Sequence, residues 1–164
     1  MKFYPTLDDV PADFGPSAVT IGKFDGVHSG HRSVIARLRR DAAAAGLVST
    51  VLSFDRHPLA LLSPDSYPES LTSNDQKRAV LETTGIDALV MIEFTHAFSL
   101  KTPEDFVTDV LVGALHAKLV FVGPDFRFGH RGRGSVEELE RLGHLHGFEV
   151  RMIEAVRQIG RAHV

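Results

Sequence analysis

Two histidines stand three positions apart in the stretch His28-Ser29-Gly30-His31, which follows a short β-branched run at residues 19–21. Imidazoles at this spacing near a helix start can face the same anion, and each can donate a hydrogen bond to it. Gly22 and Gly26 allow the chain between the run and the histidines to turn tightly. The first turn of a helix adds unpaired backbone N–H groups and a positive dipole end. The stretch therefore predicts a strand, a phosphate-binding turn and a helix, with His28 and His31 contacting the phosphate.

Two simpler roles for the same pair of histidines remain open. The pair fits ordinary surface histidines, and it fits metal ligands less well because no further Cys/His cluster accompanies it. Neither the glycine fingerprint of dinucleotide-binding domains nor the P-loop pattern is present around the pair. A phosphate-binding turn of another kind is the interpretation that we favour.

A second stretch, residues 123–134, has the sequence GPDFRFGHRGRG and follows an apolar run at residues 118–122. Its arginines and glycines suit a cationic loop, which a solvated basic turn would also explain. Phe126 and Phe128 alternate with charged residues and indicate a loop that is anchored by its aromatic rings. If both runs are strands of one parallel sheet, this loop lies at the same sheet edge as His28 and His31.

A third stretch, Asp55-Arg56-His57-Pro58, follows the apolar run at residues 47–54. Pro58 ends the strand and biases His57 toward an extended conformation. The loop is predicted at the same carboxyl edge of the sheet, where open α/β folds bind ligands. A simple strand exit without function is the alternative.

The elements that position these loops alternate along the chain. We expect strands at residues 19–21, 47–54, 87–94, 118–122 and 148–153, with helices at 32–45, about 72–84, about 102–115 and 135–146. In the helix at 72–84, Gln76, Ala79 and Val80 are expected on the inner side. This order predicts an α/β fold, a Rossmann-like doubly wound, mostly parallel five-stranded sheet with helices on both faces. Residues 2–4 are a plausible additional edge strand.

The composition limits the function classes. A chain of 164 residues with 43% hydrophobic and 24% charged residues suits one globular domain spanning residues 1–164. A net charge of -3 offers no general attraction to nucleic acid or to anionic membranes. The absence of cysteine excludes disulfides, thiolate metal sites and thiol catalysis. The first residues carry acids and prolines where a signal peptide needs an apolar run, so we expect a cytoplasmic location, small-molecule partners, no nucleic acid and no membrane.

The string IGKFDGVHSGH at residues 21–31, together with the DRHP and GPDFRFG loops, resembles a known family. It is similar to the H-x-G-H nucleotidyltransferases, in particular the FMN adenylyltransferase (FAD synthetase) module of bacterial bifunctional riboflavin kinase/FAD synthetase. The resemblance extends over nearly all of the chain. It implies transfer of AMP from ATP to FMN with Mg²⁺, giving FAD and pyrophosphate.

The resemblance also implies roles for individual residues. His28 and His31 would be the catalytic residues. The ATP site would comprise Gly22, Lys23, Phe24, Asp25, Gly26, His28, Gly30, His31 and Arg127. The flavin site would comprise Phe54, His57, Pro58, Asp125, Phe126 and Phe128. Mg²⁺ binds largely through substrate phosphates, so its protein ligands stay unknown, with Asp25 and Asp125 as candidates.

The sequence departs from the family pattern in three ways. Ser53 stands where the family's T-F-D-P-H-P loop has threonine, and Arg56 stands for its first proline. The family's S-S-T-x-x-R turn is expected directly after a segment such as residues 160–164, and the chain ends before it, with the riboflavin kinase domain absent. We therefore expect reduced turnover from these residues alone. A nucleotidyltransferase for another small phosphorylated acceptor and a non-catalytic flavin- or nucleotide-binding module remain alternatives.

Overall fold

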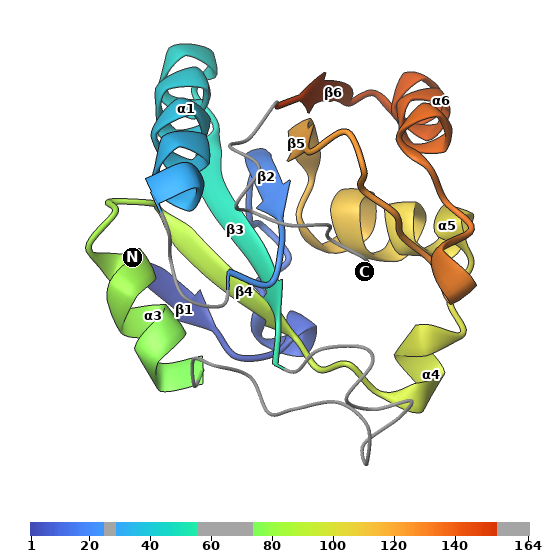
Figure 1. The fold of residues 1–164 in the computed structure, drawn as a ribbon, viewed down its shortest axis with the longest axis horizontal. Helices are drawn as coiled ribbons and strands as arrows, with labels where there is room; N and C mark the ends of the chain where they lie inside the picture. The colour runs from blue at the N-terminus through green and yellow to red at the C-terminus, as the bar shows by residue number, and fades with distance from the viewer. Residues whose placement is uncertain (25–28, 56–73, 154–164) are drawn as a thin grey trace.

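A single sheet runs through the middle of the structure, a computed structural model that describes residues 1–24, 29–55 and 74–153 (Figure 1). Its six strands lie in the order β1-β4-β3-β2-β5-β6, and every neighbouring pair is parallel. The doubly wound α/β class is confirmed. The strands are β1 (Lys2–Tyr4), β2 (Ser17–Ile21), β3 (Val48–Phe54), β4 (Ala88–Ile92), β5 (Ala117–Val122) and β6 (Glu149–Met152).

The expected strand number of five is corrected to six. The additional strand is β1, which pairs with β4 through Lys2 opposite Ala88 and Tyr4 opposite Val90. This strand is the plausible edge strand at residues 2–4, which the expected number of five did not include, and its pairing with β4 confirms it. All strand pairs are parallel, where the sequence predicted a mostly parallel sheet.

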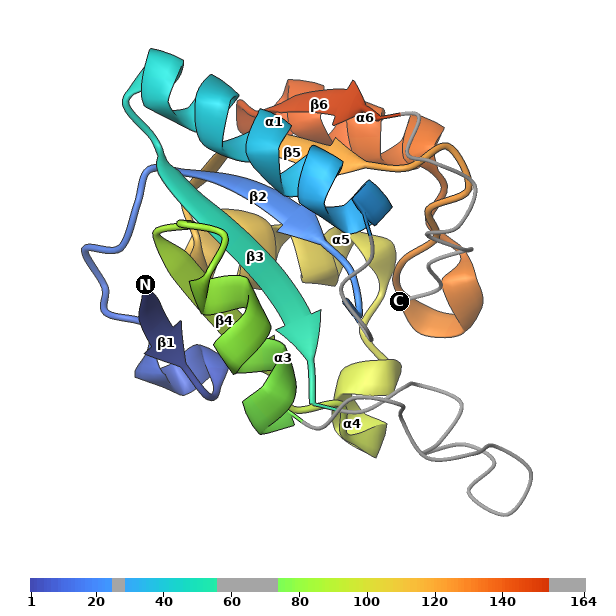
Figure 2. The same cartoon turned by 60° about the vertical axis from the view of Figure 1, so that its left-hand side comes forward.

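Helices cover both faces of the sheet, as predicted. α1 (Ser29–Ala45) and α3 (Asn74–Glu82) pack on one face, whereas α5 (Pro103–Phe106), the π-helix η2 (Val107–Ala114) and α6 (Val136–His146) pack on the other (Figure 2). The remaining short helices are η1 (Leu7–Asp9), α4 (His96–Ser99) and η3 (His130–Gly132). No helix within the described ranges is long and apolar enough to cross a membrane.

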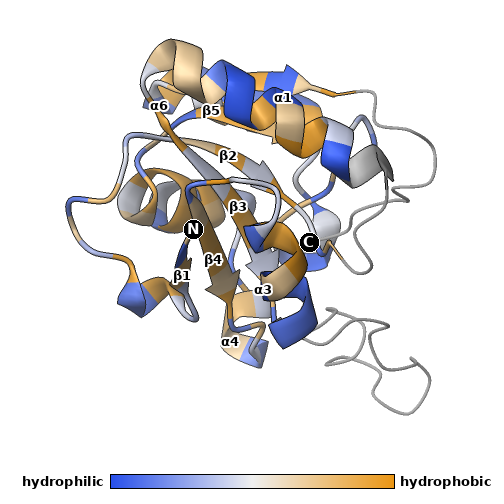
Figure 3. Ribbon diagram, turned by 90° about the vertical axis from the view of Figure 1, so that its left-hand side faces the viewer, coloured by the Kyte–Doolittle hydropathy of each residue, from blue (hydrophilic) through white to orange (hydrophobic). Residues whose placement is uncertain are grey.

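The two faces of the sheet bury separate apolar clusters. In β4, Leu89 and Met91 pack toward α1 and α3, while Val90 and Ile92 pack toward η2 and α6. Because both faces are covered, the central strands β2, β3 and β4 are buried along nearly their whole length, whereas α1 and α3 carry hydrophilic residues on their outer sides (Figure 3). This arrangement leaves the ends of the strands, rather than their faces, for ligand binding.

The second half of the helix predicted at residues 102–115 is π-helical. The backbone N–H of Leu115 donates to the carbonyl of Val110 over 3.0 Å, one residue further back than in an α-helix. A Cβ on Gly113 would lie 2.7 Å from the Thr108 carbonyl oxygen, so glycine is the residue that this wider turn admits. The sequence indicates a helix here but not its width.

The inner side of α3 differs from the prediction. Gln76 and Ala79 are exposed and Val80 is half-buried, while Lys77 and Leu81 are buried with 2% and 0% of their surface exposed. A lysine is ordinarily assigned to the solvent side of a helix. Lys77 faces inward because its amino group donates hydrogen bonds to oxygen atoms at the end of β3. Helical periodicity does not reveal such a tertiary contact.

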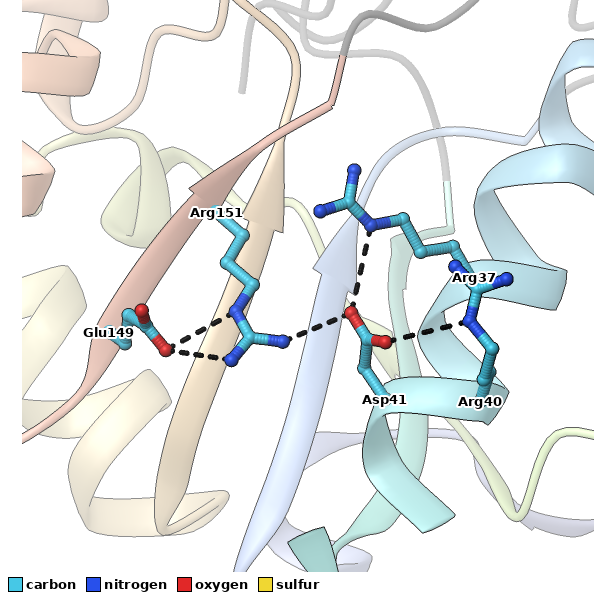
Figure 4. A network of polar contacts seen from close by, with 5 residues as sticks. All are labelled: Arg37, Arg40, Asp41, Glu149 and Arg151. Atoms are coloured by element: carbon cyan, nitrogen blue, oxygen red, sulfur yellow. Dashed lines mark hydrogen bonds and ion pairs between the residues drawn. The ribbon is translucent and has the colours of Figure 1, made fainter. Parts of the chain in front are cut away.

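A network of charged side chains ties the edge strand β6 to α1 (Figure 4). Arg151 on β6 lies 3.0 Å from Asp41 on α1 and 3.0 Å from Glu149, and Arg37 and Arg40 approach the same aspartate at 3.6 and 3.8 Å. Partial burial lowers the pKa of Arg151, but hydrogen bonds to Glu149 and Asp41 outweigh that effect and raise the pKa above its ordinary value. The guanidinium thus stays charged wherever the protein is folded.

Substitutions of Arg151 and Arg40 compare a partly buried contact of this network with an exposed one. The Arg151 side chain is 34% exposed and Arg40 is 75% exposed, although both contact the carboxylate of Asp41. We expect Arg151→Met to lower the free energy of unfolding by about 1 kcal/mol, because it breaks two partly shielded ion pairs. Arg40→Met should change it by less than about 0.5 kcal/mol. Urea denaturation measures both, and equal effects would contradict the interpretation.

Candidate functional site

The three stretches singled out in the sequence leave three consecutive strands at one edge of the sheet. β2 lies between β3 and β5, with Ile21 opposite Leu52 and Thr20 opposite Phe121. Because the three strands are parallel, their carboxyl ends lie at the same edge of the sheet, and the chain leaves all three there. β2 continues into α1 on one face and β5 continues toward α6 on the other, so this edge is the switch point at which such folds bind ligands.

The turn after β2 is tied to the end of β3. The backbone N–H of Gly22 donates to the carbonyl of Leu52 over 3.1 Å. One residue further on, the hydroxyl of Ser53 donates to the carbonyl of Lys23 over 3.0 Å. Phe24 then turns its ring into the core, 5% exposed, with a positive φ of 54°. The start of the predicted phosphate-binding turn is therefore fixed to its neighbour.

Helix α1 begins at Ser29, three residues before the predicted start at residue 32, which places Gly30 and His31 in its first turn. This first turn follows β2 at its carboxyl end, and the first turn of any helix carries backbone N–H groups without partners inside the helix. Asp25, Gly26 and His28 lie outside the described residues, as does the side chain of His31. The phosphate-contacting roles of the two histidines stay predictions.

The start of the DRHP loop is fixed by backbone contacts to the segment after β4. The N–H of Asp55 donates to the carbonyl of Ile92 over 3.0 Å, and a carboxylate oxygen of Asp55 accepts from the N–H of Phe94 over 2.9 Å. Arg56, His57 and Pro58 fall outside the described ranges. The position of this loop's first residue is set, and the part of His57 and Pro58 in flavin binding stays a prediction.

The basic loop after β5 is closed on itself and anchored, as the alternation of rings and charges predicted. Phe128 and Gly134 exchange two backbone hydrogen bonds of 3.1 and 2.8 Å, and the N–H of His130 donates to the carbonyl of Lys101 over 2.8 Å. The rings of Phe126 and Phe128 are buried. The charged side chains Asp125, Arg127, Arg131 and Arg133 are all exposed. The loop thus presents cations from a fixed backbone.

A row of aromatic rings connects the basic loop with the end of β3. Phe128 packs against Phe106 at a centroid distance of 5.8 Å, Phe106 against Phe98 at 6.1 Å and Phe98 against Phe54 at 6.2 Å. Phe126 stacks on Phe128 at 5.7 Å. Rings that contact one another in this way hold the basic loop and the end of β3 in a defined relation. The predicted flavin contacts of Phe54, Phe126 and Phe128 stay predictions.

The candidate metal ligands are the least defined part of the site. Among the described side chains, no group of three or more histidine, aspartate or glutamate residues is placed to hold a metal ion. Asp125 is exposed on the basic loop, and Asp25 lies outside the described ranges. A carboxylate such as Asp125 together with substrate phosphates matches the oxygen donors that Mg²⁺ prefers.

Lys77 is a residue that the sequence interpretation missed. Its ammonium lies 3.3 Å from the hydroxyl of Ser53 and 3.3 Å from the carbonyl oxygen of Phe54, at the end of β3 that feeds the DRHP loop. The available signal was its spacing of four residues from Leu81, which places a lysine on the apolar stripe of a short helix.

This fold and this loop cluster define a Rossmann-like α/β domain with its candidate ligand site at the switch point of the sheet. The chain belongs to the FAD synthetase family, whose model matches residues 10–164.

Relatives of known name agree with this assignment. The chain is 36% identical over 132 residues to the bifunctional riboflavin kinase/FMN adenylyltransferase of Escherichia coli strain K12, covering 80% of this chain and 42% of that protein. The protein of the same name from Listeria monocytogenes is 35% identical over 152 residues, which cover 92% of this chain and 48% of that protein. The chain therefore spans less than half the length of these relatives.

A solved structure shows the same fold. A crystal structure described as a macrolide-efflux protein from Streptococcus pneumoniae superposes with a TM-score of 0.75 at 24% identity, covering 93% of this chain and 50% of that one. At this identity the similarity concerns the fold alone.

The closure of the basic loop is testable at its glycines. A Cβ on Gly134 would lie 2.6 Å from the buried ring of Phe128, whereas a Cβ on Gly123 would meet no atom within 4 Å. We expect Gly134→Ala to lower the free energy of unfolding by about 1–3 kcal/mol through overpacking. Gly123→Ala, at the other end of the loop, should change it by less than about 1 kcal/mol. Urea denaturation of both variants checks this, and an unaffected Gly134→Ala protein would contradict the loop geometry.

Proposed function

We propose that this protein is an FMN adenylyltransferase, which transfers AMP from ATP to FMN and forms FAD and pyrophosphate. The observation that carries the proposal is the meeting of the three predicted ligand loops at the switch point of the sheet, in a chain of the FAD synthetase family. The names of the relatives from Escherichia coli and Listeria monocytogenes support the same activity.

The proposed reaction needs no nucleophilic side chain. A phosphate oxygen of FMN attacks the α-phosphorus of ATP and forms a new P–O bond. The bond from that phosphorus to the oxygen bridging the α- and β-phosphates breaks, and its electron pair leaves with pyrophosphate. The protein contributes by aligning the two substrates and by stabilising the negative charge that develops on the phosphates.

Each loop has a part in this proposal. His28 and His31, with the first turn of α1, donate hydrogen bonds to the triphosphate of ATP, and Lys23 and Arg127 add positive charge. The exposed arginines of the basic loop suit the same anionic substrates. The DRHP loop, together with Phe54, Phe126 and Phe128, holds the flavin side. Mg²⁺, held through substrate phosphates and an aspartate such as Asp125, supplies charge neutralisation when bound.

We further propose that FMN reaches this domain from riboflavin kinase activity. The relatives are named for both activities, and the matched residues cover less than half of each of them. A kinase that phosphorylates riboflavin produces the phosphate oxygen that the adenylyl transfer uses. The two reactions are therefore consecutive in chemistry.

The direct test is to incubate the purified protein with Mg²⁺, ATP and FMN and to follow FAD and pyrophosphate together. We expect both products in equal amounts, because the bond changes above release one pyrophosphate for each FAD. Binding of ATP and FMN without product would instead favour a nucleotide- and flavin-binding module. Binding of neither substrate would contradict the proposal.

The histidines are tested by substitution. We expect His28→Ala and His31→Ala each to lower kcat about 100- to 1000-fold, because each removes a donor from a phosphate that gains charge in the transition state. The dissociation constant for FMN should change little. His144→Ala is the matched control, since His144 is exposed near the end of α6, which leads to the opposite edge of the sheet. Equal losses of turnover and FMN affinity would contradict the phosphate contact.

A further inference from the structure

Lys77 buries its ammonium group beside the loops of the candidate site. The residue is 2% exposed, and its amino group donates to the hydroxyl of Ser53 and to the carbonyl of Phe54, both at 3.3 Å. α3, which carries Lys77, lies beside β3 in Figure 2. The ammonium therefore contacts the last two residues of β3, directly before the DRHP loop.

Burying the ammonium of Lys77 costs free energy, and filling this space in the core does not require a charged group. Removing an ammonium group from water is unfavourable, and an apolar side chain of similar length would fill the same space without that cost. Lys77 also occupies the apolar stripe of α3, one turn before the fully buried Leu81. What the amino group adds beyond packing is therefore hydrogen bonding, including its bonds to Ser53 and Phe54.

Both of these acceptor atoms lie at the end of β3, and Ser53 extends the contact to the turn after β2. The hydroxyl of Ser53 accepts a hydrogen bond from Lys77 and donates its own hydrogen to the carbonyl of Lys23, 3.0 Å away. Because an ammonium can only donate, the direction of both hydrogen bonds is fixed. The chain of contacts runs from α3 through the end of β3 to the turn after β2.

We propose that Lys77 is a positioning residue that sets the spacing between the phosphate-binding turn after β2 and the flavin-side loop after β3. This inference rests on the proposed function, since it assigns one substrate to each loop. Each loop binds its own ligand, and the link through Ser53 aligns the two ligands for the transfer. Loss of the link therefore affects the reaction step more than the binding of either ligand alone.

The first test replaces Lys77 with methionine. We expect Lys77→Met to lower kcat about 10- to 100-fold, since small misalignments of two reactants have effects of this size. The dissociation constants of ATP alone and FMN alone should change less than about threefold, and the urea midpoint should not fall. Lys118→Met, which removes an exposed lysine on β5, is the control and should leave all of these values unchanged. A kcat within about twofold of the wild type would overturn the proposal.

A second pair of variants tests the hydroxyl and covers the case in which Lys77→Met does not fold. Ser53→Thr and Ser53→Val add nearly the same volume at a fully buried position, and only threonine keeps the hydroxyl. We expect Ser53→Val to have a kcat at least about tenfold below that of Ser53→Thr, with similar urea midpoints. Equal kcat values for the pair would overturn the proposal.

Hydrogen exchange separates this inference from the proposed function. The backbone N–H groups of Gly22 and Asp55 donate to Leu52 and Ile92, at the starts of the two loops. In ligand-free protein we expect both to exchange at least about fivefold faster in Lys77→Met, or in Ser53→Val, than in the wild type and in Ser53→Thr. A wild type that forms no FAD would refute the activity, whereas unchanged exchange at these amides would refute the positioning role by itself.

Discussion

The parallel pairing of β2 with β3 and β5 is the constraint on which the candidate site depends. Its backbone hydrogen bonds bring residues about 100 positions apart, such as Thr20 and Phe121, opposite each other. Since the three strands run in one direction, the loops that follow them meet at one edge, and no loop could move to another without breaking a ladder of hydrogen bonds. The apolar clusters on both faces stabilise this ladder and exclude water from it.

Hydrogen bonds hold the described first residues of the loops after β2 and β3 and close the basic loop. Asp55 is bound to the segment after β4, Gly22 and Lys23 are bound to β3, and the basic loop closes through Phe128 and Gly134. Aromatic rings continue this support from Phe54 to the basic loop. Fixed loop bases with exposed charged side chains suit a site that aligns two anionic substrates, because orientation is obtained before the ligands arrive.

The chain belongs to the FAD synthetase family, and the adenylyl transfer proposed for it needs no nucleophilic side chain. A reaction in which one substrate attacks the other places the demand on geometry and charge. On this proposal, buried hydrogen bonds near the site, including those of the Lys77 ammonium, maintain the spacing between the turn after β2 and the loop after β3. Burying such polar groups lowers the free energy of unfolding, and the sheet with its two apolar clusters supplies the stability that offsets this loss.

The sequence by itself determined the α/β class, the helix caps and the three stretches that carry the predicted site. These features depend on local patterns: Ser135 caps α6, Gly147 ends it, and glycines and histidines mark the turn after β2. The tertiary structure alone decided that the edge strand suggested at residues 2–4 pairs with β4, that η2 widens into a π-helix and that Lys77 faces inward. Each of these depends on a distant partner: the free edge of β4 for β1, the packing of η2 against the sheet, and the oxygen atoms of Ser53 and Phe54 for Lys77. Local periodicity carries no information about partners that only the folded chain brings together.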